Sequence, residues 1–230
     1  MVEGSDIFCR ALNPTDIAPM PITAFPPLEL ALPSGLLAIG GDLSVPSLLL
    51  AYRSGIFPWP HDDHELLWFS PPTRTVLFFK DLRIPRSLKK GLRRTSLSFR
   101  VNTACEEVIE RCSELHNRGD QSATWITPGM KSAYVDLHRE GYCISFESWR
   151  SEMLVGGMYG VLINRFFAGE SMFYREPNGS KISLVRGLAY LAERGVEWMD
   201  CQMSSALVMQ LGAREVRREE YGEMLRAVVG

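Results

Sequence analysis

The chain has 230 residues, of which 46% are hydrophobic and 23% are charged, and its formal net charge is −2. This size suits one large domain, or a medium domain with a small companion, and the apolar fraction can build a core without disulfides. The weak net charge excludes nucleic-acid binding by the chain as a whole, so such binding must come from a local patch. Five cysteines without a CxxC pair and only four histidines argue against a metal site and favour a cytoplasmic protein with reduced thiols.

Proline and glycine interrupt the first third of the chain. Residues 1–34 are rich in proline and are expected to cross the surface in extended form. The segment 35–43, GLLAIGGDL, lacks the lysine and the glycine spacing of a phosphate-binding loop. Trp59, Trp68 and Phe69 then follow between prolines. Such aromatic residues usually belong to a core, but a cluster of them also suits stacking on nucleic-acid bases.

A regular pattern begins after Arg74, with strands expected over 75–79 and 97–101 and a helix between them. Leucines four residues apart give this helix one apolar face. Its other faces carry Arg86, Lys89, Lys90, Arg93 and Arg94. A run of charges is usually a solvated face, but these cations have no acidic residue among them in a net-acidic chain. The pattern therefore favours binding to a phosphate backbone.

The second half predicts an α+β fold with a mixed sheet. A helix capped by Thr103 is expected to reach about Arg118, and a second helix starts at Thr127. The strands expected next form an antiparallel meander over 142–149, 154–163 and 166–173. The remaining elements expected are a helix over 180–194, a strand over 196–200, a helix over 204–211, a strand over 213–216 and a terminal helix from about 219.

This element order is the layout of an N-acetyltransferase-type (GNAT) domain, in which the central sheet splays open to admit an acyl donor. Enzymes of that type grip the pyrophosphate of acetyl-CoA with an [RQ]xxGx[GA] loop. The corresponding turn here, 175–181 (REPNGSK), lacks that spacing. The layout thus suggests acyl transfer, while the turn argues against CoA as the donor.

Glu170, Asp200 and Gln202 are the candidate polar groups of a site. Glu170 lies in the last strand of the meander, and the other two follow a strand at its C-terminal end, where open α/β sheets bind ligands. Two ordinary roles stay open: Glu170 pairing with Arg175 at the surface, and Asp200 capping the next helix. Strand alternation predicts that Asp200 and Gln202 face the site and that Cys201 between them faces the core.

Several stretches in the same order closely resemble the leucyl/phenylalanyl-tRNA–protein transferase family. They are GLLAIGGDL (35–43), AYRSGIFPW (51–59), WFSPPTR (68–74), TWIT (124–127), LVGGMYGV (154–161), GESMF (169–173), NGSK (178–181), DCQ (200–202) and LGA (211–213). The resemblance runs from about residue 33 to the end. It implies an aminoacyltransferase that moves leucine or phenylalanine from charged tRNA to the α-amino group of N-terminal lysine or arginine, marking acceptor proteins for degradation.

The resemblance also implies an architecture, a set of site residues and the absence of a cofactor. A small N-terminal domain, 1–73, precedes an acetyltransferase-like catalytic domain, 74–230, in a protein expected to be a monomer. Trp59 stacks on the terminal adenosine, and Trp125 belongs to the same site. Asp200 and Gln202 relay a proton from the attacking amine, and Glu170 lines the site. An apolar pocket for the aminoacyl side chain is expected from Met158, Phe167, Met172 and the helix that starts at Ser180.

The chain departs from the family pattern at a few positions. Leu207 and Ile144 stand where the family commonly has histidine, and Gly187 stands where a bulky apolar residue is frequent. A glycine there predicts a wider pocket and an altered preference among leucine, phenylalanine and methionine. Two other functions remain open: a CoA-dependent N-acetyltransferase of the same fold, and a tRNA-binding module without catalytic activity.

Overall fold

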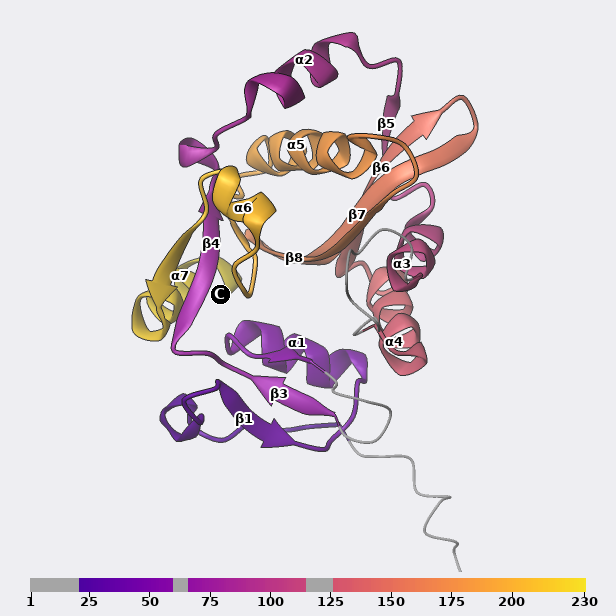
Figure 1. Ribbon diagram of the computed structural model, residues 1–230. Helices are drawn as coiled ribbons and strands as arrows, with labels where there is room; N and C mark the ends of the chain where they lie inside the picture. Colours follow the sequence, from indigo (N-terminus) through magenta and orange to yellow (C-terminus); the bar gives the residue numbers. More distant parts are fainter. Residues whose placement is uncertain (1–20, 60–65, 115–125) are drawn as a thin grey trace, which may run out of the picture.

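The computed structural model describes residues 21–59, 66–114 and 126–230. Their fold is α+β and is built on a mixed seven-stranded sheet, as the element order predicts, with a smaller sheet beside it (Figure 1). The strand order in the large sheet is β10-β4-β9-β8-β7-β6-β5. Its strands are β4 (Thr73–Phe78), β5 (Ser98–Val101), β6 (Cys143–Arg150), β7 (Met153–Ile163), β8 (Phe166–Tyr174), β9 (Trp198–Asp200) and β10 (Arg214–Arg217).

The meander of β6, β7 and β8 confirms the prediction from alternating residues. These strands pair antiparallel, and Ser151 and Asn164 take positive φ angles of 53° and 52° in the two turns. β9 reaches the sheet by a crossover through α5 (Gly179–Ala192) and pairs parallel to β8. A parallel neighbour of this kind needs such a helical connection, whereas the tight turns of the meander join only antiparallel strands.

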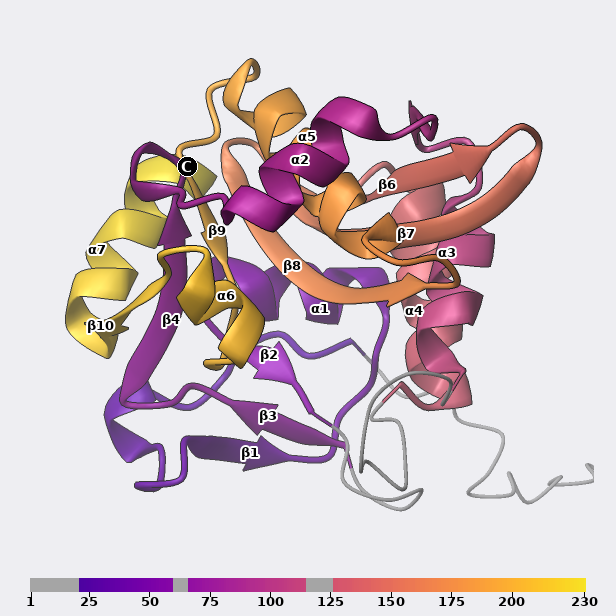
Figure 2. The same ribbon diagram turned by 45° about the horizontal axis from the view of Figure 1, so that its top comes forward.

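The sheet opens between β8 and β9. These strands pair only at Phe167 with Met199 and at Ala168 with Asp200, after which β9 ends and β8 continues to Tyr174. Figure 2 shows β8 curving away from β9 beyond this point, with α6 (Ala206–Gln210) beside β9. The opening exposes the edge of β8 from Gly169 onward.

Helices cover both faces of the large sheet. One face packs α1 (Val45–Arg53), α3 (Cys105–Ser113), α4 (Pro128–Arg139) and α7 (Arg218–Val229), whereas the other packs α5, α6 and α2 (Arg86–Arg94). Strand alternation feeds the two cores, since Tyr159 and Phe166 lie in the first and their neighbours Met158 and Phe167 in the second. No helix within the described ranges is long and apolar enough to span a bilayer.

The smaller sheet lies under the opening of the large one. Its strands, β1 (Leu36–Ile39), β2 (Phe57–Pro58) and β3 (Leu67–Phe69), are antiparallel in the order β1-β3-β2 (Figure 1). The short 3-10 helices are η2 (Leu28–Leu30) and η3 (Phe79–Asp81). The chain returns from the small sheet into β4, so the two sheets meet near Phe57 and Arg74.

The start of α3 corrects one expectation. Thr103 is not the cap of this helix: the N-cap residue is Ala104, and the helix ends at Ser113 rather than near Arg118. Among the described residues, no side-chain cap hydrogen bond is present at Ala104. Instead, the buried carboxylate of Glu147 fixes the segment just before the helix, because its Oε1 accepts from the backbone N–H groups of Thr103 and Ala104, each over 2.9 Å. A local motif did not reveal this contact, since Glu147 comes from β6, far along the chain.

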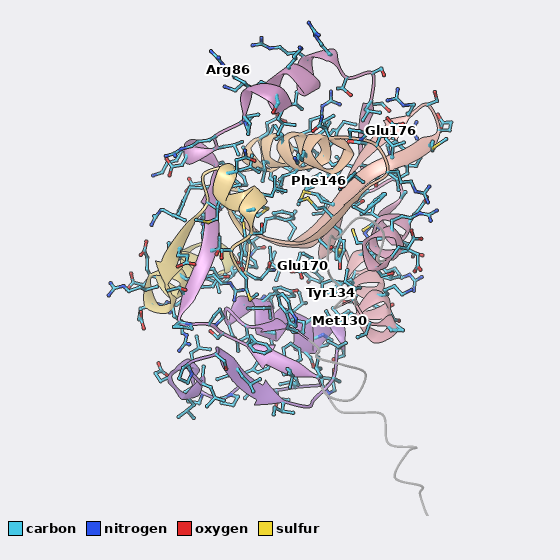
Figure 3. The ribbon with its side chains drawn as sticks, in the orientation of Figure 1. Arg86, Met130, Tyr134, Phe146, Glu170 and Glu176 are labelled. Atoms are coloured by element: carbon cyan, nitrogen blue, oxygen red, sulfur yellow. The ribbon has the colours of Figure 1, made fainter. Side chains whose placement is uncertain are left out.

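Gly187 does not widen a pocket. A Cβ built at Gly187 would lie 2.5 Å from Cδ2 of Phe146, whose ring is fully buried between α5 and the sheet. The space left by the missing side chain is therefore filled by Phe146, which Figure 3 shows beside α5. The prediction of a wider aminoacyl pocket from this glycine is wrong.

Candidate active site

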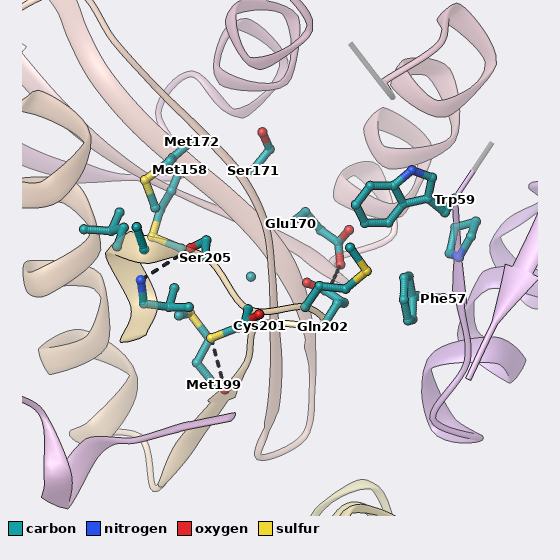
Figure 4. Close-up of a pocket in the computed structure, with 17 residues that line it drawn as sticks. Phe57, Trp59, Met158, Glu170, Ser171, Met172, Met199, Cys201, Gln202 and Ser205 are labelled. Carbon is teal, nitrogen blue, oxygen red and sulfur yellow. Dashed lines mark hydrogen bonds between the residues drawn. The ribbon is translucent and has the colours of Figure 1, made fainter. Parts of the chain in front are cut away.

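A cavity of about 870 Å³ occupies the opening between β8 and β9 (Figure 4). Three parts of the chain line it: residues 57–59 from the small sheet, residues 169–172 of β8, and residues 201–208 after β9. Met158 and Met199 complete the lining. The volume is in the usual range for small-molecule sites, which are mostly apolar with a few convergent polar groups.

One end of the cavity is apolar. Met158, Met172 and Met199 lie there in one hydrophobic cluster with Leu207 and Val208 of α6. Gly169 contributes no side chain, and a Cβ at that position would lie 2.8 Å from Sδ of Met199. Flexible, polarisable methionine side chains adapt to ligands of different shape. This end therefore suits an apolar side chain of variable outline.

The other end is polar and is centred on Glu170. Its Oε1 lies 2.8 Å from the hydroxyl of Tyr52 and accepts from Nε2 of Gln202 over 2.9 Å, while its Oε2 lies 3.0 Å from the hydroxyl of Tyr134. Trp59 lies beside this carboxylate at the side of the small sheet (Figure 4). Glu170 is partly exposed into the cavity and does not pair with Arg175, so the surface-pair interpretation is wrong.

Burial changes the acidity of Glu170. Loss of water around the carboxylate raises the pKa of Glu170 from 4.5 to about 7, and the negative charge of Asp200 adds to the rise. The hydrogen bonds with Tyr52 and Tyr134 and the charge of Arg74 act in the opposite direction. A carboxyl group with a pKa near the working pH is suited to accept and return a proton.

Asp200 does not line the cavity, which corrects the expectation that it faces the site. It is fully buried and accepts four hydrogen bonds from the described residues. Oδ1 accepts from Nε of Arg74 and the backbone N of Gln202, and Oδ2 from Nη2 of Arg74 and the hydroxyl of Tyr221. A carboxylate offers about four acceptor positions, so none is left for a substrate amine. Nor does Asp200 cap α6, whose N-cap is Ser205.

Gln202 reaches the cavity by a different route from the one alternation predicts. Its φ angle is +52°, a left-handed conformation that breaks the strand pattern after Asp200. The side-chain amide consequently turns to Glu170 rather than to Asp200, which contacts only its backbone. Cys201 packs against the core, as expected, and it also borders the cavity.

The remaining predicted site residues divide into two groups. Trp59, Met158 and Met172 line the cavity. Phe167 and Ser180 do not: Phe167 is fully buried against Phe146, and Ser180 is buried at the start of α5. Leu207 and Ile144, the two positions where the family commonly has histidine, lie in different places. Leu207 lines the cavity, whereas Ile144 lies in the core. Trp125 lies outside the described residues.

Three residues of this region escaped the sequence reasoning: Tyr52, Tyr134 and Arg74. All are buried, and each makes contacts with residues more than 35 positions away. Tyr52 and Tyr134 lie on the apolar faces of α1 and α4, where a tyrosine is easily taken for core. For the two tyrosines, the signal that could have identified them is a hydroxyl on a helix face that is otherwise mostly apolar.

The basic helix α2 is exposed, as predicted. Arg86, Lys89, Lys90, Arg93 and Arg94 all face solvent, and no ion pair links them to an acid in the described part of the chain. The helix packs on α5 through its apolar face, and the backbone N of Arg83, just before it, donates to the carbonyl of Leu211 at the end of α6. Figure 3 shows Arg86 at the outer edge of the molecule. Over residues 21–59, 66–114 and 126–230, no cluster of three histidine, cysteine or carboxylate side chains suits a metal ion.

Comparisons with known proteins agree on one family. The family model described as leucyl/phenylalanyl-tRNA protein transferase matches residues 76–226, and the model of the N-terminal domain of the same proteins matches residues 41–72. A leucyl/phenylalanyl-tRNA–protein transferase of Syntrophobacter fumaroxidans is 48% identical over 201 residues, covering 87% of this chain and 86% of the relative. One from Nitrosomonas eutropha is 46% identical, covering 88% and 87%.

Among solved structures, a conserved protein of unknown function from Staphylococcus epidermidis resembles this chain with a TM-score of 0.37 and 12% identity. The similarity covers 63% of this chain and 57% of that one. A likeness this distant does not assign the fold.

Proposed function

The chain belongs to the leucyl/phenylalanyl-tRNA–protein transferase family, and from this premise we propose that it transfers leucine or phenylalanine from charged tRNA to the N-terminal amino group of acceptor proteins. The observation that supports the proposal most directly is the cavity between β8 and β9, because it joins an apolar end to a polar end with a carboxyl–amide pair. An aminoacyl ester needs both parts: a place for its side chain, and polar groups where the amine attacks.

The donor is proposed to enter with its side chain at the methionine end. Met158, Met172 and Met199 would surround leucine or phenylalanine, and their flexibility suits methionine as well. The terminal adenosine would stack on Trp59, which lies at the opposite end of the cavity beside Glu170. The ester carbon then lies between the two ends, within reach of the acceptor amine.

The chemistry needs no covalent intermediate on the protein, since the aminoacyl ester is already activated. The site has to orient the amine, remove its proton and accommodate the tetrahedral intermediate. We assign proton removal to Glu170, whose raised pKa matches this task. Gln202 uses Nε2 to hold Glu170, so its amide oxygen is the group free to accept a hydrogen bond from the amine. A relay through Asp200 has no support in the contacts of that residue.

We propose that the tRNA body lies along α2. The exposed cations of this helix can neutralise phosphates, and the link between Arg83 and Leu211 joins the start of α2 to α6, which lines the cavity. A path from α2 over α6 thus leads from the phosphate-binding face to the donor pocket.

We also propose a division into two domains. The opening between β8 and β9 supports an N-acetyltransferase-like catalytic domain, 74–230, and the separate small sheet supports an N-terminal domain, 1–73. We further propose acceptors with N-terminal lysine or arginine, a monomer in the bacterial cytoplasm, and degradation as the fate of the modified protein. Each follows from the family rather than from a contact in the cavity.

One assay tests the activity against both alternatives. The protein is mixed with leucyl-tRNA, acetyl-CoA and two peptides that differ only in an N-terminal arginine or alanine, and the products are identified by mass. We expect the arginine peptide to gain one leucine residue. An acetylated product would instead identify a CoA-dependent enzyme, and retention of tRNA without any product would identify a binding module.

A further inference from the structure

Glu170, Tyr52 and Tyr134 form a closed triangle of oxygen atoms at the polar end of the cavity. The two tyrosine hydroxyls are 2.5 Å apart, and each also contacts one carboxyl oxygen of Glu170, over 2.8 and 3.0 Å. The tyrosines come from α1 and α4, and both are at most 1% exposed. Figure 3 shows Tyr134 close to Glu170 at the centre of the molecule.

The three contacts need three protons. Burial raises the pKa of both tyrosines well above the usual value, so each phenol keeps its single hydrogen and donates once. If Glu170 is ionised, two hydrogens must serve three contacts, and one pair of oxygens is left facing each other without a hydrogen. The contact between the Tyr52 and Tyr134 oxygens is the shortest, at 2.5 Å, so the repulsion would be greatest there if no hydrogen lay between the two atoms.

A proton on Glu170 completes the set. Oε1 of Glu170 already accepts from Nε2 of Gln202, so the added hydrogen belongs on Oε2. Glu170 then donates to Tyr134, Tyr134 donates to Tyr52, and Tyr52 donates back to Oε1 of Glu170. We propose that Tyr52 and Tyr134 form with Glu170 a hydrogen-bond ring that closes only when Glu170 carries a proton, so that the two tyrosines set the proton affinity of this base. The catalytic use of the ring rests on the proposed function.

Other charged or titratable groups around Glu170 come from four further strands. They are Arg74 on β4, Cys143 on β6, Tyr159 on β7 and Asp200 on β9. Arg74 and Asp200 act on Glu170 in opposite directions and are paired with each other. Cys143 and Tyr159 stay neutral because burial raises the pKa of each well above its usual value. The ring is thus the part of the surroundings whose hydrogen bonds change when Glu170 titrates.

In the transfer reaction, ionised Glu170 takes a proton from the amine nitrogen as this nitrogen forms its bond to the ester carbon. The ring closes around that proton while the carbonyl π electrons move to the oxygen. When the intermediate collapses, the carbon–oxygen bond to the ribose breaks, and the leaving ribose oxygen receives the proton from Glu170. The carboxylate is regenerated, and the products are an amide and a free tRNA hydroxyl. The tyrosines act through Glu170 and are positioning residues.

Infrared titration of the full-length protein without substrate tests the ring directly. The carbonyl band of protonated Glu170 is identified by its absence in Glu170→Gln, and its midpoint is followed against pH in wild type, Tyr52→Phe and Tyr134→Phe. Each tyrosine makes two of the three ring contacts, so either variant costs the protonated form two hydrogen bonds and the ionised form one. The midpoint should therefore fall by about one pH unit, opposite to the effect of losing bonds that the tyrosines donate to the ionised carboxylate alone. If the tyrosines only donate to the carboxylate, their removal raises the midpoint. A raised or unchanged midpoint would overturn the proposal.

Tyr159→Phe is the matched control. Its hydroxyl is equally buried, yet it has no hydrogen-bond partner within residues 21–59, 66–114 and 126–230, and its ring contacts that of Tyr134 at 5.4 Å between centroids. This variant should keep the wild-type midpoint. Leucine transfer is measured separately on the same proteins. If the midpoint falls in the tyrosine variants but the wild-type protein transfers no leucine, the proposed function is refuted and the hydrogen-bond ring is supported.

Discussion

Arg74 and Asp200 form a buried ion pair between neighbouring strands, with Nε and Nη2 of Arg74 donating to Oδ1 and Oδ2 of Asp200 over 2.8 and 2.7 Å. The guanidinium group also stacks on Phe57, 4.4 Å from the ring centroid. Phe57 lines the cavity next to Trp59, and Asp200 holds the backbone of Gln202. Asp200 therefore helps to position Phe57 and Gln202, which line the cavity, without lining the cavity itself.

Replacing Asp200 should affect stability before chemistry. Asp200→Asn leaves the Arg74 guanidinium buried without its counter-charge, which typically costs about 3–5 kcal/mol. We expect the free energy of unfolding in urea to fall by about this amount, and the KM for the donor to rise. As a control, Glu152→Gln breaks the exposed pair with Arg100 and should change stability by less than about 1 kcal/mol. Wild-type stability with lost kcat would instead make Asp200 a participant in the reaction.

Glu170 makes stability depend on pH. Because its pKa is about 7 in the folded protein and 4.5 ordinarily, the folded state binds more protons than the unfolded state between these values. The free energy of unfolding should therefore fall as pH rises from about 4.5 to 7, and level off above. Glu170→Gln lacks this contribution. The difference in free energy of unfolding between wild type and Glu170→Gln, measured by urea denaturation, should change by about 1–3 kcal/mol between pH 4.5 and 7. A constant difference would contradict the raised pKa.

Glu170→Gln should also abolish most of the transfer activity. The amide cannot accept the amine proton, so kcat should drop by about 10²–10⁴-fold, the usual contribution of general acid–base catalysis. Donor binding should stay near the wild-type value, because the methionine pocket and Trp59 are unchanged. Single-turnover rates and donor affinity, measured on the same preparation, separate these effects, and a variant with wild-type kcat would assign proton removal to another group.

Trp59 should matter even for a minimal donor. Stacking one base is worth roughly 1–3 kcal/mol, so Trp59→Ala should lower kcat/KM for leucyl-adenosine by about 5- to 150-fold. The comparison is with full-length leucyl-tRNA, for which the loss should be similar. If only the full-length tRNA is affected, Trp59 contacts the RNA body and does not stack on the terminal base.

The salt dependence of tRNA binding should report on α2. Lys89→Glu together with Arg93→Glu should weaken binding and lower the slope of log K against log salt, because fewer counterions are released. Arg217→Glu together with Arg226→Glu changes the net charge equally at exposed positions outside α2 and is the matched control. Equal effects of the two pairs would show that net charge, rather than this helix, governs binding.

A methyl group at Gly187 should damage the core and leave the donor pocket intact. Alanine normally stabilises a helix relative to glycine by about 1 kcal/mol, but here its Cβ would meet the buried ring of Phe146 at 2.5 Å. Gly187→Ala should therefore lower stability by about 1–3 kcal/mol, without changing the preference between leucine and phenylalanine. Gly129→Ala on α4, where the nearest atom is 3.8 Å away, should be neutral or stabilising. If Gly187→Ala instead changed the preference between leucine and phenylalanine, Gly187 would after all influence the width of the aminoacyl pocket.

Local chemistry made much of this protein predictable from its sequence. Alternating residues and turn signals predicted the meander of β6, β7 and β8, because these strands are neighbours in sequence as well as in space. The cap at Thr127 and the exposed cations of α2 also depend on spacing within a few residues. The short motifs were enough to recognise the family. Glu170 and Gln202, two of the three polar groups expected near one another, are joined by a hydrogen bond.

The tertiary structure decided what each polar side chain contacts. Asp200 faces Arg74, which is 126 positions earlier in the chain, and the left-handed backbone at Gln202 overrides alternation. Tyr52 and Tyr134 reach Glu170 only because α1 and α4 pack against the same face of the sheet at β8. Sequence periodicity shows which face of an element is buried. Which buried hydroxyls and carboxylates form hydrogen bonds with one another depends on the packing of elements far apart in the chain, and here that packing makes the site.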